Sequence, residues 1–201
     1  GMAGVKIGTH INDWNLDEEA LFAIFAKAQE LNTAIFVHPW DMMGKKDMPK
    51  YFLPWLVGMP AETSRAICSL IFGGVLERLP KLRIAFAHGG GSFPMTLGRI
   101  QHGYEARPDL CQTHIHKPPK SYLPQLYFDT LVHDAEVLNY MIKLFSPSRL
   151  AMGSDYPFPL GESTPGALIE SLTGVNREDK ERLMSGTAIE FLGLKIPQPR
   201  V

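Results

Sequence analysis

Short runs of β-branched and aromatic residues recur along the chain and alternate with longer segments of helical periodicity. The runs predict five strands, at residues 4–10, 33–38, 82–88, 126–132 and 150–155. Strands that alternate with helices pair in parallel through right-handed crossovers. The pattern therefore predicts an α/β fold built on a parallel sheet.

The segments between the strands carry apolar residues at helical spacing. We expect helices at residues 16–32, 60–80, 136–145, 165–173 and 176–191. Asn15 and Asp134 are expected to cap the first and third of these helices, and Pro60 suits the first turn of the second. The stretches 39–59 and 108–125 show neither period, so we expect long irregular segments there.

Polar residues at the strand ends favour a (β/α)8 TIM-type barrel over an open doubly wound sheet. A doubly wound sheet would carry a glycine-rich phosphate loop, but neither GTHIND (8–13) nor HGGG (88–91) has its spacing. We expect the glycines at 89–91 to turn the backbone sharply beside a site. A complete barrel has eight strands in typically ~250 residues, whereas only five are predicted in these 201 residues. We therefore expect one domain over residues 1–201, an incomplete barrel of about five βα units that lacks the first barrel strands.

A histidine or an aspartate stands at the carboxyl end of every predicted strand. These residues are His10, His38, His88, Asp129 and Asp155. The active site of such barrels lies at the carboxyl ends of the strands. Imidazole nitrogens and carboxylate oxygens suit Zn²⁺ or a similar divalent cation in an open catalytic site. Such an ion lowers the pKa of its bound water toward neutrality.

Each of these residues also has a structural alternative, because a single strand-end histidine is usually a hydrogen-bonded structural residue. We expect Asp129 to accept hydrogen bonds from loop amides. Asp155 stands among apolar neighbours and would be costly to bury without a partner, which favours it as a ligand. His114 and His116 form an H-x-H, but two prolines follow and no apolar strand precedes them, so we expect a solvated loop.

Composition narrows the classes of function. Twenty basic and twenty-one acidic residues leave a net charge of -1, which provides no basic surface for nucleic acid or a membrane. A small or anionic substrate held by individual arginines remains compatible with this balance. The two cysteines are too few for a disulfide framework, so we expect a reducing cytoplasm, with Cys68 packed in the core. No apolar stretch approaches the ~18–20 residues of a membrane span.

Four motifs in order along the chain support a family resemblance. They are AIFVHPWDM (34–42), LPWLVGMPAET (53–63), FAHGGGSFP (86–94) and GSDYPFPLGE (153–162). From about residue 4 to the C-terminal helix, the chain resembles the 2-amino-3-carboxymuconate 6-semialdehyde decarboxylase family of the amidohydrolase superfamily. The resemblance implies a zinc-dependent, non-oxidative decarboxylase of tryptophan (kynurenine) degradation that is cytoplasmic and homodimeric.

The same resemblance implies a role for individual residues. His38 and Asp155 match metal ligands, and His88 matches the acid/base residue beside a metal-bound hydroxide. Trp55 matches a residue that lines the substrate site. Arg99 matches an arginine that reaches across a dimer interface to a substrate carboxylate, a role suited to a planar guanidinium.

The chain departs from the family pattern at its beginning. The H-x-H of the first barrel strand and an upstream substrate-binding arginine have no counterpart, so two of the four expected ligands remain. His10 is a weaker candidate for a substitute ligand. Two alternatives follow: an inactive truncated chain that acts only by dimerisation, or a related decarboxylase or hydrolase of another aromatic acid.

Overall fold

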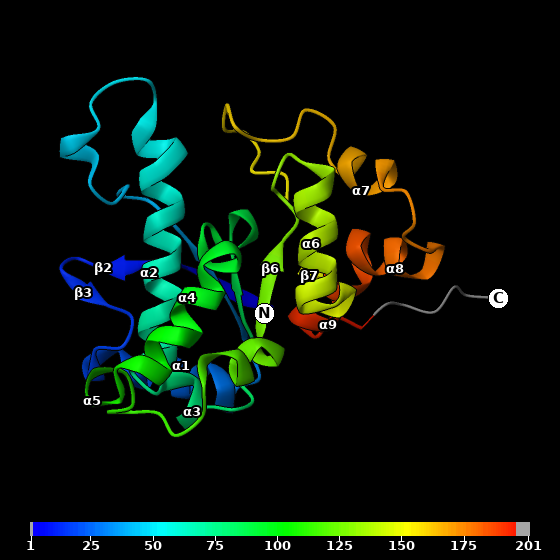
Figure 1. Ribbon diagram of the computed structural model, residues 1–201. Coiled ribbons are helices and arrows are strands. Elements are labelled where there is room, and N and C mark those ends of the chain that lie inside the picture. Colours follow the sequence, from blue (N-terminus) through cyan, green and yellow to red (C-terminus); the bar gives the residue numbers. More distant parts are fainter. Residues whose placement is uncertain (1, 196–201) are drawn as a thin grey trace.

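The computed structural model describes residues 2–195, and a single parallel sheet lies at its centre (Figure 1). The sheet contains β1 (Gly4–Gly8), β4 (Ala34–His38), β5 (Ile84–Phe86), β6 (Leu126–Asp129) and β7 (Leu150–Ala151), in that order. Every neighbouring pair is parallel. The five predicted strands and the α/β class are therefore confirmed.

The sheet is open over the described part of the chain. Strands β1 and β7 lie at its two edges, and each pairs with one neighbour only. Closure into a barrel would require eight strands. The predicted incomplete barrel is confirmed in this respect.

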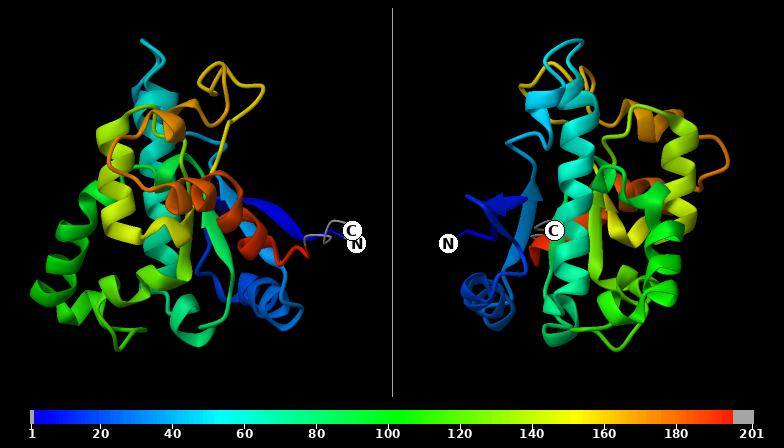
Figure 2. Two further views of the ribbon diagram at one scale, coloured as in Figure 1. Left: turned by 90° about the vertical axis from the view of Figure 1, so that its right-hand side faces the viewer. Right: turned by 60° about the vertical axis from the view of Figure 1, so that its left-hand side comes forward.

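The described residues form nine α-helices in addition to the sheet (Figures 1 and 2). They are α1 (Glu19–Glu30), α2 (Met59–Phe72), α3 (Val75–Arg78), α4 (Phe93–Ala106), α5 (Pro108–Cys111), α6 (Ala135–Phe145), α7 (Ala167–Ser171), α8 (Arg177–Glu181) and α9 (Thr187–Leu192). Helices α2, α4 and α6 stand next to one another on one face of the sheet (Figure 1). A short hairpin of β2 (His10–Ile11) and β3 (Trp14–Asn15) follows β1.

The two faces of the sheet have different functions. Ile35 and Val37 of β4, with Ile84 and Phe86 of β5, are fully buried in the main core beneath the helices. Because side chains alternate along a strand, Ala34, Phe36 and His38 point to the opposite, inner face. Among the described residues, a small cluster of Ala34, Ala85 and Tyr127 packs there against Phe191 of α9. The inner face is thus free to present His38 at the carboxyl end of β4.

Two predicted helix boundaries are wrong. Asn15 does not cap a helix, because it pairs with His10 in the β2–β3 hairpin, and α1 begins only at Glu19. The predicted helix over 60–80 ends at Phe72. Gly74 then adopts a left-handed conformation (φ 74°) and passes so close to the carbonyl oxygen of His114 that a Cβ would lie 2.6 Å from it.

The hydrophobic pattern did not predict helix α4. Only Phe93, Pro94, Leu97 and Tyr104 of its fourteen residues are buried, so its apolar period is weak.

The cap at Asp134 is confirmed, since its carboxylate accepts hydrogen bonds from the amides of Glu136 and Val137 at 2.8 and 3.0 Å. The two last predicted helices occur as α7 and as the pair α8 and α9, which a single π-type turn joins.

Over residues 2–195, none of the helices combines the length and the apolar character that a bilayer crossing requires.

Candidate active site

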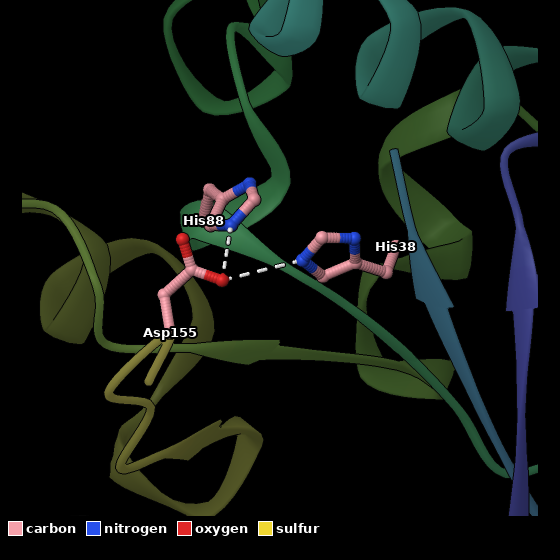
Figure 3. A group of neighbouring side chains, drawn as sticks. All are labelled: His38, His88 and Asp155. Carbon is pink, nitrogen blue, oxygen red and sulfur yellow. Dashed lines mark hydrogen bonds and ion pairs between the residues drawn. The ribbon is translucent and has the colours of Figure 1, made fainter. Parts of the chain in front are cut away.

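Three of the predicted site residues meet at the carboxyl end of the sheet (Figure 3). His38 ends β4, His88 follows β5, and Asp155 follows β7. His38 Nε2 lies 3.4 Å from Asp155 Oδ1, and His88 Nε2 lies 3.5 Å from the same oxygen. The side chains are 13–18% exposed, so a small molecule can reach them. This cluster is the candidate metal site of the described residues.

The hydrogen bond on the far side of His38 determines which ring nitrogen is available. Its Nδ1 lies 2.7 Å from the backbone oxygen of Pro39, and a carbonyl oxygen can only accept a hydrogen bond. The hydrogen therefore sits on Nδ1, and Nε2 presents a lone pair to Asp155. Burial, with smaller contributions from His88 and Lys6, lowers the pKa of His38 and favours this neutral form. Such an outer hydrogen bond is typical of a metal-binding histidine.

The spacing of the three donors fits a cation. Two donors bound tetrahedrally to a zinc-sized ion stand about 3.4 Å apart, given bonds of roughly 2.0–2.2 Å. The two measured nitrogen–oxygen separations are 3.4 and 3.5 Å. A lone pair of His38 facing a carboxylate oxygen is unfavourable unless a proton or a cation lies between them. The donor set of two imidazoles and one carboxylate therefore fits Zn²⁺ or a similar divalent ion.

Asp129 supports the loop that carries His88. Its carboxylate accepts hydrogen bonds from the backbone amides of His88 and Gly89, both at 2.9 Å, and of Leu131 at 3.1 Å. Burial raises the pKa of Asp129, and the amide donors oppose that rise. The prediction that Asp129 accepts from loop amides is confirmed.

The glycines after His88 permit the sharp turn that was predicted. Gly89, Gly90 and Gly91 all have positive φ angles, and a Cβ on Gly91 would lie 2.3 Å from the carbonyl oxygen of Pro60. His88 and Asp155 also have positive φ angles, of 55° and 52°. This conformation is uncommon for residues other than glycine and is enriched at functional sites, although residues outside the site, such as Asn32 and Ser146, also adopt it.

His10 lies apart from the cluster. The β2–β3 hairpin turns it away, so that its Nδ1 is 2.6 Å from the oxygen of Asn12 and its ring stacks on Trp40 at 5.0 Å. Among the described residues, the group within metal-binding distance contains His38, His88 and Asp155 but not His10. His114 and His116 lie in the predicted loop, where Nδ1 of the exposed His116 is 2.7 Å from Glu77 Oε1.

A large cavity of about 1070 Å³ opens above the cluster. Its wall is mostly apolar, and the stacked rings of Phe52 and Trp55, 4.5 Å apart, form one side. Trp55 lines this cavity, and its predicted contact with a substrate stays a prediction. Arg99 lies on α4 and does not line the cavity of its own chain, so its predicted role across a dimer interface stays a prediction.

Two residues of this region were not singled out from the sequence. Glu62 of α2 is fully buried and accepts hydrogen bonds from the Thr9 hydroxyl and from the amides of Trp40 and Asp41, the latter two at 3.1 and 3.4 Å. It thus anchors the turn that follows His38. A charged residue inside an otherwise apolar helical face is the signal that points to it. Lys6 of β1 lines the cavity.

The amidohydrolase family profile matches residues 1–194. The chain is 54% identical, over 194 residues, to the 2-amino-3-carboxymuconate-6-semialdehyde decarboxylase of Dictyostelium discoideum. The aligned residues make up 96% of this chain and 54% of that protein. The enzyme of the same name from Caenorhabditis elegans is 34% identical, with 96% of this chain and 56% of that protein covered. The chain thus spans about half the length of the curated relatives it matches.

Solved structures show the same fold. The crystal structure of Metarhizium anisopliae IDCase superimposes with a TM-score of 0.82 at 25% identity, over 95% of this chain and 56% of that one. The 5-carboxyvanillate decarboxylase LigW of Sphingomonas paucimobilis gives a TM-score of 0.84 at 21% identity, over 96% and 59%. A 5-carboxyvanillate decarboxylase from Novosphingobium aromaticivorans, with a TM-score of 0.80 at 20% identity over 96% and 57%, is complexed with manganese.

Proposed function

The chain belongs to the amidohydrolase family, and on that premise we propose that it contributes the metal-binding and proton-transfer residues of a decarboxylase of 2-amino-3-carboxymuconate 6-semialdehyde. The proposal is carried by one observation: His38, His88 and Asp155, at the ends of three strands, converge within 4.8 Å in a chain 54% identical to the Dictyostelium enzyme of that activity. The same proposal assigns the chain to tryptophan (kynurenine) degradation in the cytoplasm.

His38 and Asp155 would hold a divalent cation, for which we propose zinc because the donors are nitrogen and oxygen in a partly open site. When bound, the ion would lower the pKa of a coordinated water and polarise the substrate. His38 is kept neutral and correctly oriented by its Nδ1 hydrogen bond to Pro39.

His88 would move the proton. Its Nε2 lies 3.5 Å from Asp155 Oδ1, beside the metal position and facing the cavity. In the overall reaction the bond between the substrate and its carboxylate breaks, carbon dioxide leaves, and the remaining carbon takes up one proton. An imidazole can accept a proton from water and return it to that carbon near neutral pH.

Phe52 and Trp55 would hold the conjugated part of the substrate. Their stacked rings form an apolar wall of the cavity. A flat unsaturated molecule packs well against such rings, and once bound there it would itself shield part of the apolar wall from water.

The test is release of carbon dioxide and loss of the semialdehyde absorbance by the purified chain after loading with zinc or, in a parallel sample, manganese. The expected result is turnover by a metal-loaded sample and none by the His88→Ala variant. A folded chain that binds metal yet releases no carbon dioxide would contradict decarboxylation by this chain itself and would favour the alternative of an inactive chain that acts only by dimerisation. Substituted benzoates in the same assay distinguish decarboxylation of the semialdehyde from that of another aromatic acid.

We also propose a homodimer in which Arg99 of each subunit serves the cavity of its partner. The proposal is supported by the position of Arg99 on α4, outside the cavity of its own chain. Mixing Arg99→Ala and His88→Ala chains tests it, because a mixed dimer regains one intact site. Random pairing should restore about a quarter of the wild-type activity, whereas no recovery in verified mixed dimers would contradict the shared site.

A further inference from the structure

Lys6 lies on the inner face of the sheet, below the candidate metal site. Strand β1 pairs with β4 so that Lys6 is opposite Phe36 and Gly8 is opposite His38. Paired residues of parallel strands point to the same face, and side chains two positions apart share that face. The Lys6 side chain therefore points to the same face as His38, from a position two residues before the one that pairs with His38. It lines the same cavity.

The ammonium group of Lys6 has no partner in the described part of the chain. The side chain is exposed to the cavity, and residues 2–195 offer it neither an ion pair nor a hydrogen bond. The other titratable residues that line the cavity are the four histidines His10, His38, His88 and His133 and the single carboxylate Asp155. Among the described lining residues, Lys6 is thus the one permanent positive charge.

The charge of Lys6 faces a cavity whose wall is mostly apolar. In such surroundings an ammonium group attracts a negatively charged group of a ligand more strongly than it does in water.

We propose that Lys6 binds a second carboxylate of the substrate, one that is retained in the product, and thereby selects dicarboxylates over monocarboxylates. This inference rests on the proposed function, since the semialdehyde named there carries two carboxylates and loses one. A retained carboxylate against apolar walls is costly without a cation. An ammonium donates a charge-assisted hydrogen bond to it without hindering the reaction.

The departing carboxylate is the less suitable partner for Lys6. Its negative charge disappears as carbon dioxide forms, so a cation bound to it would stabilise the ground state more than the transition state. The pairing with the retained group avoids that penalty. A lysine can serve here because its long stem lies along the apolar wall and only the charged end needs polar surroundings.

The test compares two probes that are not decarboxylated, benzene-1,3-dicarboxylate and benzoate, by titration calorimetry on the metal-loaded chain. We expect the wild type to bind the dicarboxylate about 10- to 100-fold more tightly than benzoate, the range of a hydrogen bond to a charged group. Lys6→Gln should abolish the preference and Lys6→Arg should restore part of it. The matched control Lys143→Gln replaces an exposed lysine of α6 and should leave it unchanged.

The outcomes separate this inference from the proposed function. A dicarboxylate preference that survives Lys6→Gln, or that the wild type lacks, overturns the inference. If the preference depends on Lys6 but no carbon dioxide is released, the dicarboxylate site stands and the proposed decarboxylation fails. If turnover is observed, Lys6→Gln should raise KM about 10-fold or more with little change in kcat, since it removes binding common to the ground and transition states.

Discussion

His38 and Asp155 are separated by 117 residues in the chain, yet Nε2 of the first lies 3.4 Å from Oδ1 of the second. The contact joins the ends of β4 and of β7, which are separated in the sheet by β5 and β6. A lone pair and a carboxylate oxygen face each other there, with His88 beside them. Such an arrangement is stable when a positive charge lies between the two groups.

Removal of either ligand should weaken metal binding. We expect His38→Ala and Asp155→Asn each to raise the dissociation constant for Co²⁺ or Zn²⁺ by about 100-fold or more, since loss of an outer-sphere partner alone commonly changes it by 10- to 100-fold. The measurement is a cobalt titration followed by visible absorbance. His116→Ala, in an exposed loop, is the control and should bind as the wild type does. Equal affinities for all of these chains would place the metal elsewhere.

His88→Ala should abolish turnover and leave the metal content nearly unchanged. The reason is that the proposed role of His88 is proton transfer, whereas His38 and Asp155 hold the ion. The measurement combines elemental analysis with the carbon dioxide assay. His88 Nε2 is 3.5 Å from Asp155 Oδ1, so the geometry also permits coordination. Loss of metal along with activity would make His88 a ligand instead.

Asp129→Asn should destabilise the fold by about 2 kcal/mol. The NH2 group of asparagine cannot accept the backbone hydrogen bonds that a carboxylate oxygen of Asp129 accepts in the wild type. The carboxylate accepts three backbone hydrogen bonds, from His88, Gly89 and Leu131. Urea unfolding followed by circular dichroism measures the change. Asp134→Asn is a matched control, because asparagine caps a helix about as well as aspartate. A similar small effect for both variants would mean that the His88 loop does not need the Asp129 charge.

Glu62→Ala should lower both stability and metal affinity. Three donors would lose their acceptor in a buried place, among them the amides of Trp40 and Asp41 in the turn after His38. We expect a loss of about 2–4 kcal/mol in the free energy of unfolding. Glu62→Gln keeps one carbonyl oxygen as an acceptor and should therefore lose less of the free energy of unfolding than Glu62→Ala. Full metal affinity in a destabilised Glu62→Ala chain would show that the turn is held by other contacts.

The contribution of Glu77 to stability should depend on pH in the acid range. The hydrogen bond from Tyr122, with further contributions from His116, lowers the pKa of Glu77 from its ordinary 4.5 to about 2. A pKa that is lower in the folded state gives stability that is present above pH 4.5 and disappears as the pH falls through the folded value. Glu77→Gln should therefore be less stable than the wild type at pH 6.

The difference between Glu77→Gln and the wild type should shrink steadily between pH 4.5 and about 2. Urea midpoints at intervals over this range provide the measurement. Tyr122→Phe, which removes the main donor, should show a smaller pH dependence than the wild type. A gap that does not change with pH would show that the shape of Glu77, rather than its charge, supports the loop.

Much of the fold follows from local pattern. The five strands and the cap at Asp134 were predicted because β-branched runs and capping residues act over a few positions. Helix α4 was not, since only four of its residues are buried and its apolar stripe is narrow. The role of Asn15 was predicted wrongly because the β2–β3 pairing, a contact with His10, outweighs its capping tendency.

The sequence by itself determined which chemical groups stand at the strand ends, because strand periodicity and parallel pairing bring the carboxyl ends together. The tertiary structure decided which of those groups meet. His38, His88 and Asp155 converge, the β2–β3 hairpin removes His10, and backbone amides occupy Asp129. The path of a loop and the direction of a side chain depend on contacts between distant segments, such as the 117-residue separation of His38 and Asp155, and no local pattern encodes them.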